Sequence, residues 1–171
     1  MWEALEGALL RWIHVFVGIM WVGLLYYLNF VNVDAMKQAS AAGEGAPISK
    51  YVMPRVLFFF RWAALATWIV GAGLLSTMQS AGGLNGFLAA FGLQGEFAPI
   101  GIGAWLGTIM LFNVWGIIWP NQQKILGMKP ATDEEKAKAR RVAFLTSRVN
   151  TMLSIPMLWF MVTGPHQSIY H

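Results

Sequence analysis

The sequence predicts an all-α integral membrane protein, built as a bundle of four membrane-spanning helices. Hydrophobic residues make up 57% of the 171 residues and charged residues only 12%, which is about half of their share in soluble domains. Four apolar runs are each long enough to cross a bilayer, which needs about 20 residues of helix. The basic residues between these runs gather in two of the three connecting loops.

The four predicted spans lie near residues 8–33, 56–78, 100–119 and 142–162, and residues 1–171 form a single domain without an internal repeat. The first span follows MWEALEGALL, which lacks the basic leader of a signal peptide, so we expect it to be retained. The chain has no cysteine, which excludes disulfides, iron–sulfur clusters and covalently attached haem.

The three loops have different compositions. KQASAAGEGAPISK, residues 37–50, is small and polar and is expected to be a flexible connector. SAGGLNGFLAAFGLQGEF, residues 80–97, has glycines around Phe87, Leu88 and Phe91, which suits a short interfacial segment or a docking surface for a partner. In PATDEEKAKARR, Thr132 and Glu135 have capping-box spacing, so the last helix should begin before the membrane.

The basic residues also predict how the spans are oriented in the membrane. Lysine and arginine occur in the first and third loops and are absent from the second. Because such residues are retained on the cytoplasmic side, both termini and His14, His166 and His171 should face the periplasm or exterior. Although the formal charge is +4, the basic residues form no continuous stripe, so nucleic acid is not an expected partner.

The first span contains an ionisable ring in apolar surroundings, which by default suggests function. Arg11, His14, Gly18, Trp21 and Leu25 lie three or four residues apart and share one helix face. Gly18, one turn beyond His14, leaves space in which a porphyrin could lie with His14 as an axial ligand of the iron. The alternative is that His14 hydrogen-bonds a neighbouring helix.

The other spans also contain polar residues that are candidates for a structural or functional role. Arg61 either snorkels to the headgroups or binds an anion. Asn113 follows Gly103 and Gly107, whose spacing lets helices approach closely, and it is expected to join helices. The fourth span is polar, with Arg148 and Asn150 ahead of Pro156, and should line a cavity or meet polar partners.

The last candidate follows the end of the fourth span. In VTGPHQ, Gly164 and Pro165 end the helix and His166 comes next. His166 is either a solvated tail residue or a second ligand, since an even number of spans brings it to the same face as His14. The ten methionines are expected to be apolar filler.

Four segments carry a resemblance to a known family: LLRWIHVFVGIMWVGLLYY, TWIVGAGLL, GTIMLFNVWGIIWPNQQK and NTMLSIPMLWFMVTGPH. They resemble the membrane domain of bacterial membrane-bound urate hydroxylases of the PuuD type, the urate oxidase N-terminal domain family. The last two segments are the most specific. Members typically have more membrane helices and a fused cytochrome c domain that accepts electrons, so this chain resembles a compact four-helix version without that cytochrome.

The resemblance also has departures. Where longer members carry further histidines this chain has Phe58 and Val149, and Ala63 stands near an acidic position of the family. The resemblance therefore implies that the chain does not oxidise urate unaided. The retained His14 and His166 would still serve as ligands of one haem b.

Three functional hypotheses follow, in order of preference. The first is a haem-b-binding electron-transfer protein that exchanges electrons with a periplasmic cytochrome c, with Arg11 paired to a haem propionate. The second is a non-catalytic accessory subunit of a larger respiratory or photosynthetic complex, or a homo-oligomer, in the lipid bilayer. The third is a urate-oxidising enzyme, whose anion pocket would use Arg61, Asn113, Arg148 and Asn150.

Overall fold

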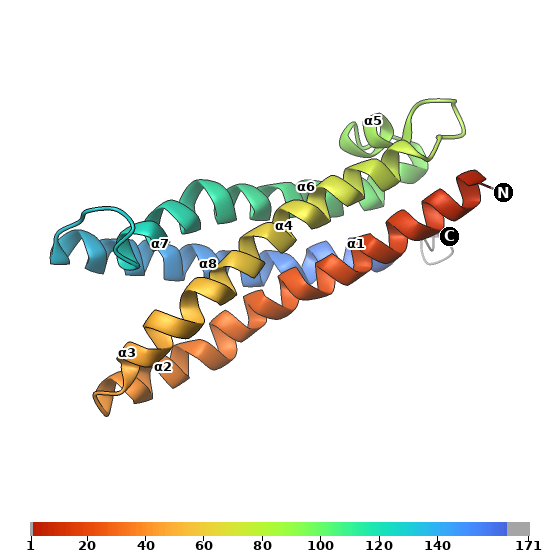
Figure 1. Cartoon of the computed structure of the whole chain (residues 1–171). Coiled ribbons are helices and arrows are strands. Elements are labelled where there is room, and N and C mark those ends of the chain that lie inside the picture. Colours follow the sequence, from red (N-terminus) through yellow and green to blue (C-terminus); the bar gives the residue numbers. More distant parts are fainter. Residues whose placement is uncertain (1, 164–171) are drawn as a thin grey trace.

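The computed structural model describes residues 2–163, and these are almost entirely helical (Figure 1). The α-helices are α1 (Trp2–Tyr26), α2 (Asn32–Ala41), α3 (Gly45–Pro47), α4 (Met53–Ser76), α5 (Gly86–Phe91), α6 (Ala98–Phe112), α7 (Trp119–Ile125) and α8 (Asp133–Thr163). Three π-helical segments, η1 (Tyr27–Val31), η2 (Ile48–Val52) and η4 (Asn113–Ile118), and a 3₁₀ turn, η3 (Gly95–Phe97), join them. The prediction of an all-α fold is confirmed.

Three continuous helical stretches are long and apolar enough to cross a membrane: Leu5–Ala41, Gly45–Ser76 and Gly95–Ile125. They contain predicted spans 8–33 and 100–119 and all but the last two residues of 56–78, and their composition fits an integral membrane protein. Helix α8 has 31 residues and includes the fourth predicted span. Its sequence carries Ser147, Arg148 and Asn150 within that span, and it is not among the three stretches, so a fourth crossing stays a prediction.

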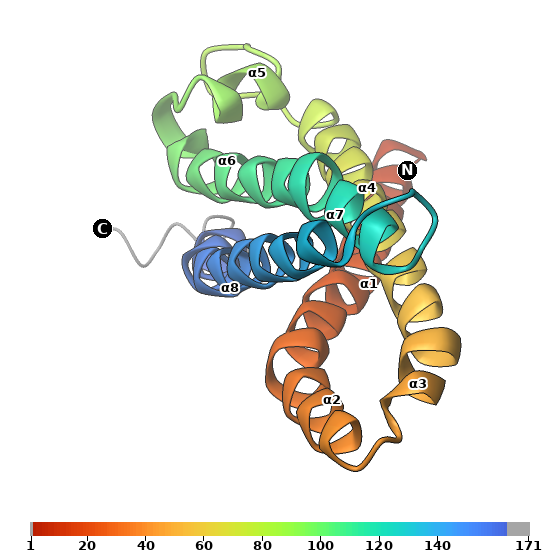
Figure 2. The same ribbon diagram turned by 90° about the vertical axis from the view of Figure 1, so that its left-hand side faces the viewer.

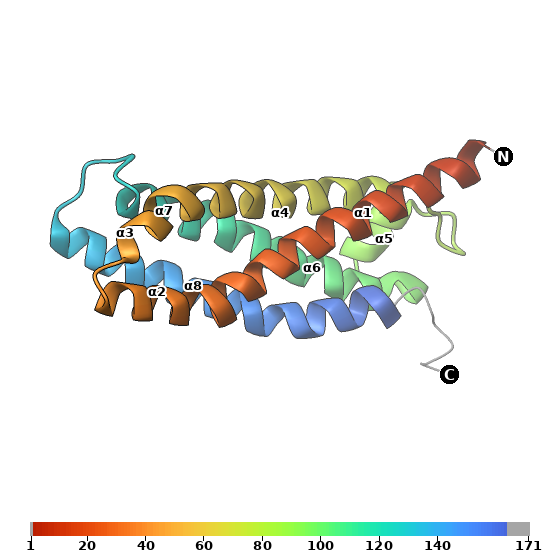
Figure 3. The ribbon, with the colours of Figure 1, turned by 60° about the horizontal axis from the view of Figure 1, so that its bottom comes forward.

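The long helices pack as two pairs, α1 with α4 and α6 with α8. The pairs cross at an angle (Figures 1 and 3) and diverge at one end, where α2 and α3 lie apart from α7 and α8 (Figure 2). We call this the basic end, because it carries the loops rich in lysine and arginine. The start of α1 and the end of α8 both lie at the other end, beside α5. Which end faces the cytoplasm stays a prediction.

The core lies where the two pairs cross. Its largest fully buried side chains include Phe60, Leu25, Met110 and Val114, and Trp21 is also buried there. Each pair contributes to this cluster, so it holds the pairs together.

The prediction that residues 37–50 form a flexible connector is wrong for most of that segment. Helix α2 continues to Ala41, and helical structure resumes at Gly45 and runs through η2 into α4. Gly43 lies in the left-handed region, with φ of 76°, which ends α2 and reverses the chain. The alanines and lysines that made this segment look like a linker are good helix formers, so only a short turn remains.

The segment between α4 and α6 contains a short helix, α5, which includes Phe87, Leu88 and Phe91. Asn85 caps this helix, α5, by accepting a hydrogen bond from the Phe87 N–H at 3.0 Å. Helix α5 packs closely on α4: a Cβ built on Gly86 would lie 2.5 Å from the carbonyl oxygen of Leu75. Whether α5 lies in the membrane interface stays a prediction.

The start of α8 confirms the predicted capping box. The Glu135 carboxylate accepts the Thr132 N–H at 2.8 Å, and the Thr132 hydroxyl accepts the Glu135 N–H at 3.2 Å. The hydrogen bond from the Thr132 N–H lowers the pKa of Glu135. This cap fixes the first turn of α8 outside the predicted span.

Candidate functional site

His14 lies on the face of α1 that packs against α4. Its Nδ1 is 2.9 Å from the carbonyl oxygen of Thr67. Because a carbonyl oxygen only accepts hydrogen bonds, Nδ1 must carry the proton. In the neutral ring Nε2 then holds the lone pair, and the described part of the chain gives it no hydrogen-bond partner. The alternative prediction, that His14 hydrogen-bonds a neighbouring helix, is confirmed for Nδ1. It leaves Nε2 available.

A glycine on α4 makes room for the imidazole. A Cβ built on Gly71 would lie 2.7 Å from Cε1 and 2.9 Å from Nδ1 of His14, and real Cβ contacts are not this short. Gly71 lies one turn beyond Thr67, so the carbonyl and the gap face the same side of α4. The residue that accommodates the ring of His14 is therefore Gly71.

Gly18 has a different neighbour from the one the sequence suggests. A Cβ built on it would lie 3.7 Å from Cγ2 of Thr67, in ordinary contact. Gly18 thus faces α4, and a flat space for a porphyrin at this position stays a prediction. Arg11, one turn before His14, is exposed. His166 lies outside the described residues.

The face of α1 that carries His14 contains a second group without a partner. Trp21 is 2% exposed, and within residues 2–163 its Nε1–H finds no hydrogen-bond acceptor. Buried hydrogen-bond donors are nearly always paired, so the unpaired indole N–H of Trp21 is unusual. Two nitrogens on one face of α1, Nε2 of His14 and Nε1 of Trp21, therefore have no hydrogen bond to the described chain.

We expect Gly71→Ala to displace the His14 ring, because the added methyl group occupies its place. The free energy of unfolding in detergent should fall by about 1–3 kcal/mol, as for other overpacked sites. Gly73→Ala is the matched control, since a Cβ there meets nothing within 4 Å. Thermal unfolding of both proteins measures the difference. Equal melting temperatures, or no relief of the Gly71→Ala effect by His14→Ala, would contradict the packing.

The polar residues of the last two helices form a buried network between α8 and its neighbours. Asn113 donates from Nδ2 to Oδ1 of Asn150 at 2.8 Å, and Asn150 donates to the carbonyl oxygen of Met110 at 3.0 Å. Asn150 is completely buried and Asn113 is 9% exposed. The expectation that Asn113 joins helices is confirmed, and Asn150 uses its carboxamide for the same purpose.

Two further hydrogen bonds join the first span to α8. Asn29, in η1, donates to the hydroxyl of Ser147 at 2.8 Å. The Tyr26 hydroxyl lies 3.0 Å from that of Ser154. The polar face of α8 therefore meets polar partners on α1 as well as on α6 and η4, which was one of the two roles expected for it.

Arg61 is half-buried and packs against aromatic rings. Its Cζ lies 3.7 Å from the ring centroid of Trp119 on α7 and 5.3 Å from that of Phe58. The carbonyl oxygen of Arg61 accepts the indole N–H of Trp115 at 3.1 Å. This guanidinium is engaged in a cation–π contact that ties α4 to α7.

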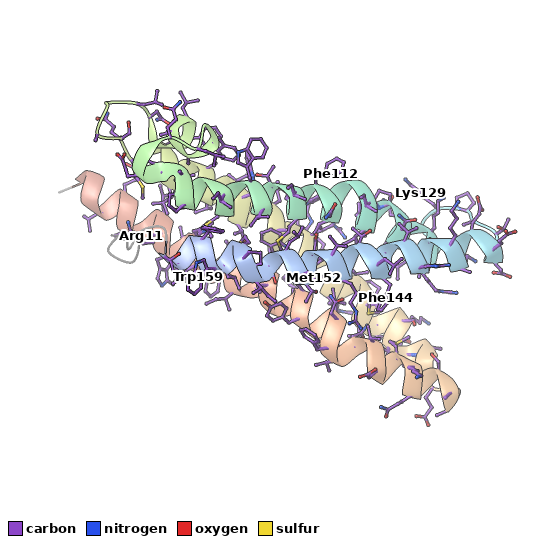
Figure 4. The ribbon with its side chains drawn as sticks, turned by 180° about the vertical axis from the view of Figure 1, so that it is seen from behind. Arg11, Phe112, Lys129, Phe144, Met152 and Trp159 are labelled. Atoms are coloured by element: carbon purple, nitrogen blue, oxygen red, sulfur yellow. The ribbon has the colours of Figure 1, made fainter. Side chains whose placement is uncertain are left out.

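Arg148 lies on the exposed side of α8. Figure 4 shows this side of the molecule, with Phe144, Met152 and Trp159 along the outer surface of the helix. The Cζ of Arg148 is 5.0 Å from the ring centroid of Phe144, one turn earlier. Asn113 and Asn150 thus bond each other in the core, whereas Arg148 is exposed; a common anion pocket that includes Arg61 stays a prediction.

Sequence reasoning missed several residues that the structure brings into these sites. Thr67 and Gly71 share a helix face by their spacing, a signal that was present on α4 without indicating which partner it met. Asn29 and Asn32 lie near the end of the first predicted span, and neither was among the predicted site residues. Both are buried, with exposed fractions of 4% and 7%, and Asn29 donates a hydrogen bond to the Ser147 hydroxyl of α8.

A comparison with family models matches residues 83–171 to the urate oxidase N-terminal family. Comparisons with curated proteins and with solved structures gave no match. The matched region begins just before α5 and includes α6, α7 and α8, the part of the chain in which the sequence resemblance was most specific. Since it covers just over half of the chain, the protein belongs to the urate oxidase N-terminal family.

Proposed function

We propose that this chain is a haem-b-binding electron-transfer protein of the urate oxidase N-terminal family, with His14 as an axial ligand of the iron. The observation that carries the proposal is the hydrogen bond from Nδ1 of His14 to the carbonyl oxygen of Thr67. Histidines that bind metals almost always donate their other ring N–H to a carbonyl or carboxylate. This second contact fixes the tautomer and leaves Nε2 as the ligand atom.

The surroundings of His14 support a ligand role. Gly71 lets the ring lie close against α4, so the imidazole is held by packing as well as by its hydrogen bond. The unpaired indole N–H of Trp21 lies two turns further along the same helix face. A polar group without a protein partner, close in sequence to an available nitrogen, is consistent with a bound group that supplies contacts the chain lacks.

The remaining parts of the proposal concern Arg11, a second ligand of the iron and a redox partner. Arg11 is exposed one turn before His14 and would pair with a propionate, because a guanidinium binds a carboxylate strongly. His166 is proposed as the second axial ligand. A bound haem b supplies one-electron chemistry, and the chain supplies its ligands and its apolar surroundings. A periplasmic cytochrome c is the proposed redox partner.

The proposal is tested by a pyridine haemochrome assay on the full chain purified from membranes. We expect haem b in the parent protein and its loss in His14→Ala. His166→Ala should shift the spectrum through loss of the second ligand, while His171→Ala serves as the matched control and should be unchanged. A colourless parent protein, or full haem retention in His14→Ala, would overturn the proposal.

Family membership favours one second candidate, a part in urate oxidation. The match includes Asn113, Arg148 and Asn150, but the two asparagines are hydrogen-bonded to each other and Arg148 is exposed. We therefore propose electron transfer as the primary function and urate as a source of the electrons. Reduction of the haem on addition of urate, alone or with a cytochrome c, supports this second candidate, and its absence argues against it.

An accessory role in a larger complex is the remaining candidate. The outer surfaces of α1, α4 and α8 carry large exposed apolar side chains, including Trp12, Trp62 and Trp159, which suit lipid and protein neighbours equally. A haem-free chain that purifies from mild detergent within a larger complex would favour this role.

A further inference from the structure

The basic end of the bundle contains a cavity that the proposed haem site does not use. The two helix pairs diverge there (Figure 2), and a cavity of about 690 Å³ lies between them. Its walls come from η1, α2, η2 and α4 on one side and from η4, α7 and α8 on the other. This volume is in the range of sites that hold small ligands.

One polar atom in the lining of the cavity lacks a hydrogen bond within residues 2–163. Asn32 lines it, is 7% exposed, and its Oδ1 has no hydrogen-bond partner in the part of the chain that the structure describes. A carboxamide oxygen only accepts hydrogen bonds. An occupant that satisfies it must therefore offer an O–H or N–H donor.

The positive charge at the rim of the cavity favours an anionic ligand. Arg140, on α8, is the one charged residue in the lining that the structure describes, and it is exposed, so it stands at the rim. Nine of the twelve lysines and arginines of the chain lie at this end, against five of the eight acidic residues. The remaining walls are largely apolar, with Met36, Met53 and Phe60 among them.

We propose that this cavity binds an anionic glycerophospholipid whose headgroup carries hydroxyl groups. The phosphate pairs with Arg140, a headgroup hydroxyl donates to Oδ1 of Asn32, and an acyl chain packs against the apolar walls. Basic pockets between membrane helices bind anionic headgroups in this way. Three helical stretches are long and apolar enough to cross a membrane, and a bilayer around them would supply such a lipid. The site is separate from His14, which lies on α1 towards the α5 end, about four turns before Leu28, the first residue of the lining.

The test compares phosphatidylglycerol with phosphatidylcholine, each added to the purified full chain in detergent. We expect phosphatidylglycerol to raise the melting temperature, followed by tryptophan fluorescence, and to remain bound in native mass spectrometry. Phosphatidylcholine should do neither. Arg140→Gln should bind phosphatidylglycerol about tenfold more weakly, as for loss of a charge-assisted hydrogen bond. Arg141→Gln is the matched control, because Arg141 is exposed and outside the lining.

A second variant separates lipid binding from folding. Asn32→Leu removes an unpaired buried acceptor, so without lipid it should be at least as stable as the parent protein. It should nevertheless lose the parent protein's expected preference for phosphatidylglycerol over phosphatidylmethanol, an anionic phosphodiester whose headgroup has no hydroxyl. Equal binding of phosphatidylglycerol by the Arg140 and Arg141 variants would overturn the proposal. So would competition by millimolar glycerol 3-phosphate, since the occupant would then be a soluble anion.

Discussion

Gly101→Ala is expected to destabilise the protein more than any other exchange of a glycine for alanine in α6. Gly101 is buried, and a Cβ built on it would run into the backbone carbonyl of Ala90 at the end of α5, and would lie 2.9 Å from Cδ2 of Leu93. Backbone atoms cannot rotate away as a flexible side chain does, so α5 must move. We expect the free energy of unfolding to fall by about 3 kcal/mol.

The control for this prediction is Gly107→Ala. Gly107 is also buried in α6, yet a Cβ there meets nothing within 4 Å, and alanine favours a helix over glycine by about 1 kcal/mol. This variant should be as stable as the parent protein or slightly more stable. Chymotrypsin provides a local measurement, because displaced α5 exposes Phe87 and Phe91. Resistance of Gly101→Ala to cleavage at these residues would show that α5 does not rest on Gly101.

Asn150→Ala is expected to produce the second large effect. Asn150 is completely buried and makes hydrogen bonds to Asn113 and to the carbonyl oxygen of Met110. Its removal leaves the carboxamide of Asn113 without its acceptor in the core. We expect a loss of about 2 kcal/mol in the free energy of unfolding, since single hydrogen bonds between membrane helices contribute up to about 1.7 kcal/mol and a cavity adds to this.

The double variant makes this prediction specific to the pair. Asn113→Ala combined with Asn150→Ala should cost less than the sum of the two single changes, because neither carboxamide is then left unpaired. Asn121→Ala is the control, as Asn121 donates only to the carbonyl oxygen of Ile117 in its own helical region, at 2.7 Å. Strict additivity in thermal unfolding would show that the two asparagines act independently.

Much of the fold follows from local properties of the sequence. The first three apolar runs predicted three helices able to cross a membrane because length and hydropathy decide this outcome. Thr132 and Glu135 predicted the start of α8 because a cap depends on residues three apart. The connector at residues 37–50 was misjudged because small polar residues occur in linkers and in helices alike. In the structure, α2 is separated from the helical segment that begins at Gly45 only by a short turn around Gly43, which adopts a left-handed conformation.

The candidate site was harder to predict, because it depends on how helices are placed against each other. His14 stood out as an ionisable residue in an apolar run. The contacts of its ring with the carbonyl of Thr67 and the gap at Gly71 could not be predicted, since they depend on the register between α1 and α4. Asn32 was missed for the same reason: its burial arises from the packing of α2 and not from its neighbours in the sequence.

The π-helical segments η1 and η4 have a consequence for how the chain tolerates changes in length. Each π turn closes a hydrogen bond over one residue more than an α turn does. Deleting one residue from η4 would let the segment close as an ordinary α-helix, with α6 and α7 keeping their faces towards α8. The same deletion within α6 would rotate everything after it by about 100°. We therefore expect η1 and η4 to accept the loss of one residue better than the α-helices beside them, provided that Asn29 and Asn113, which reach α8, are kept.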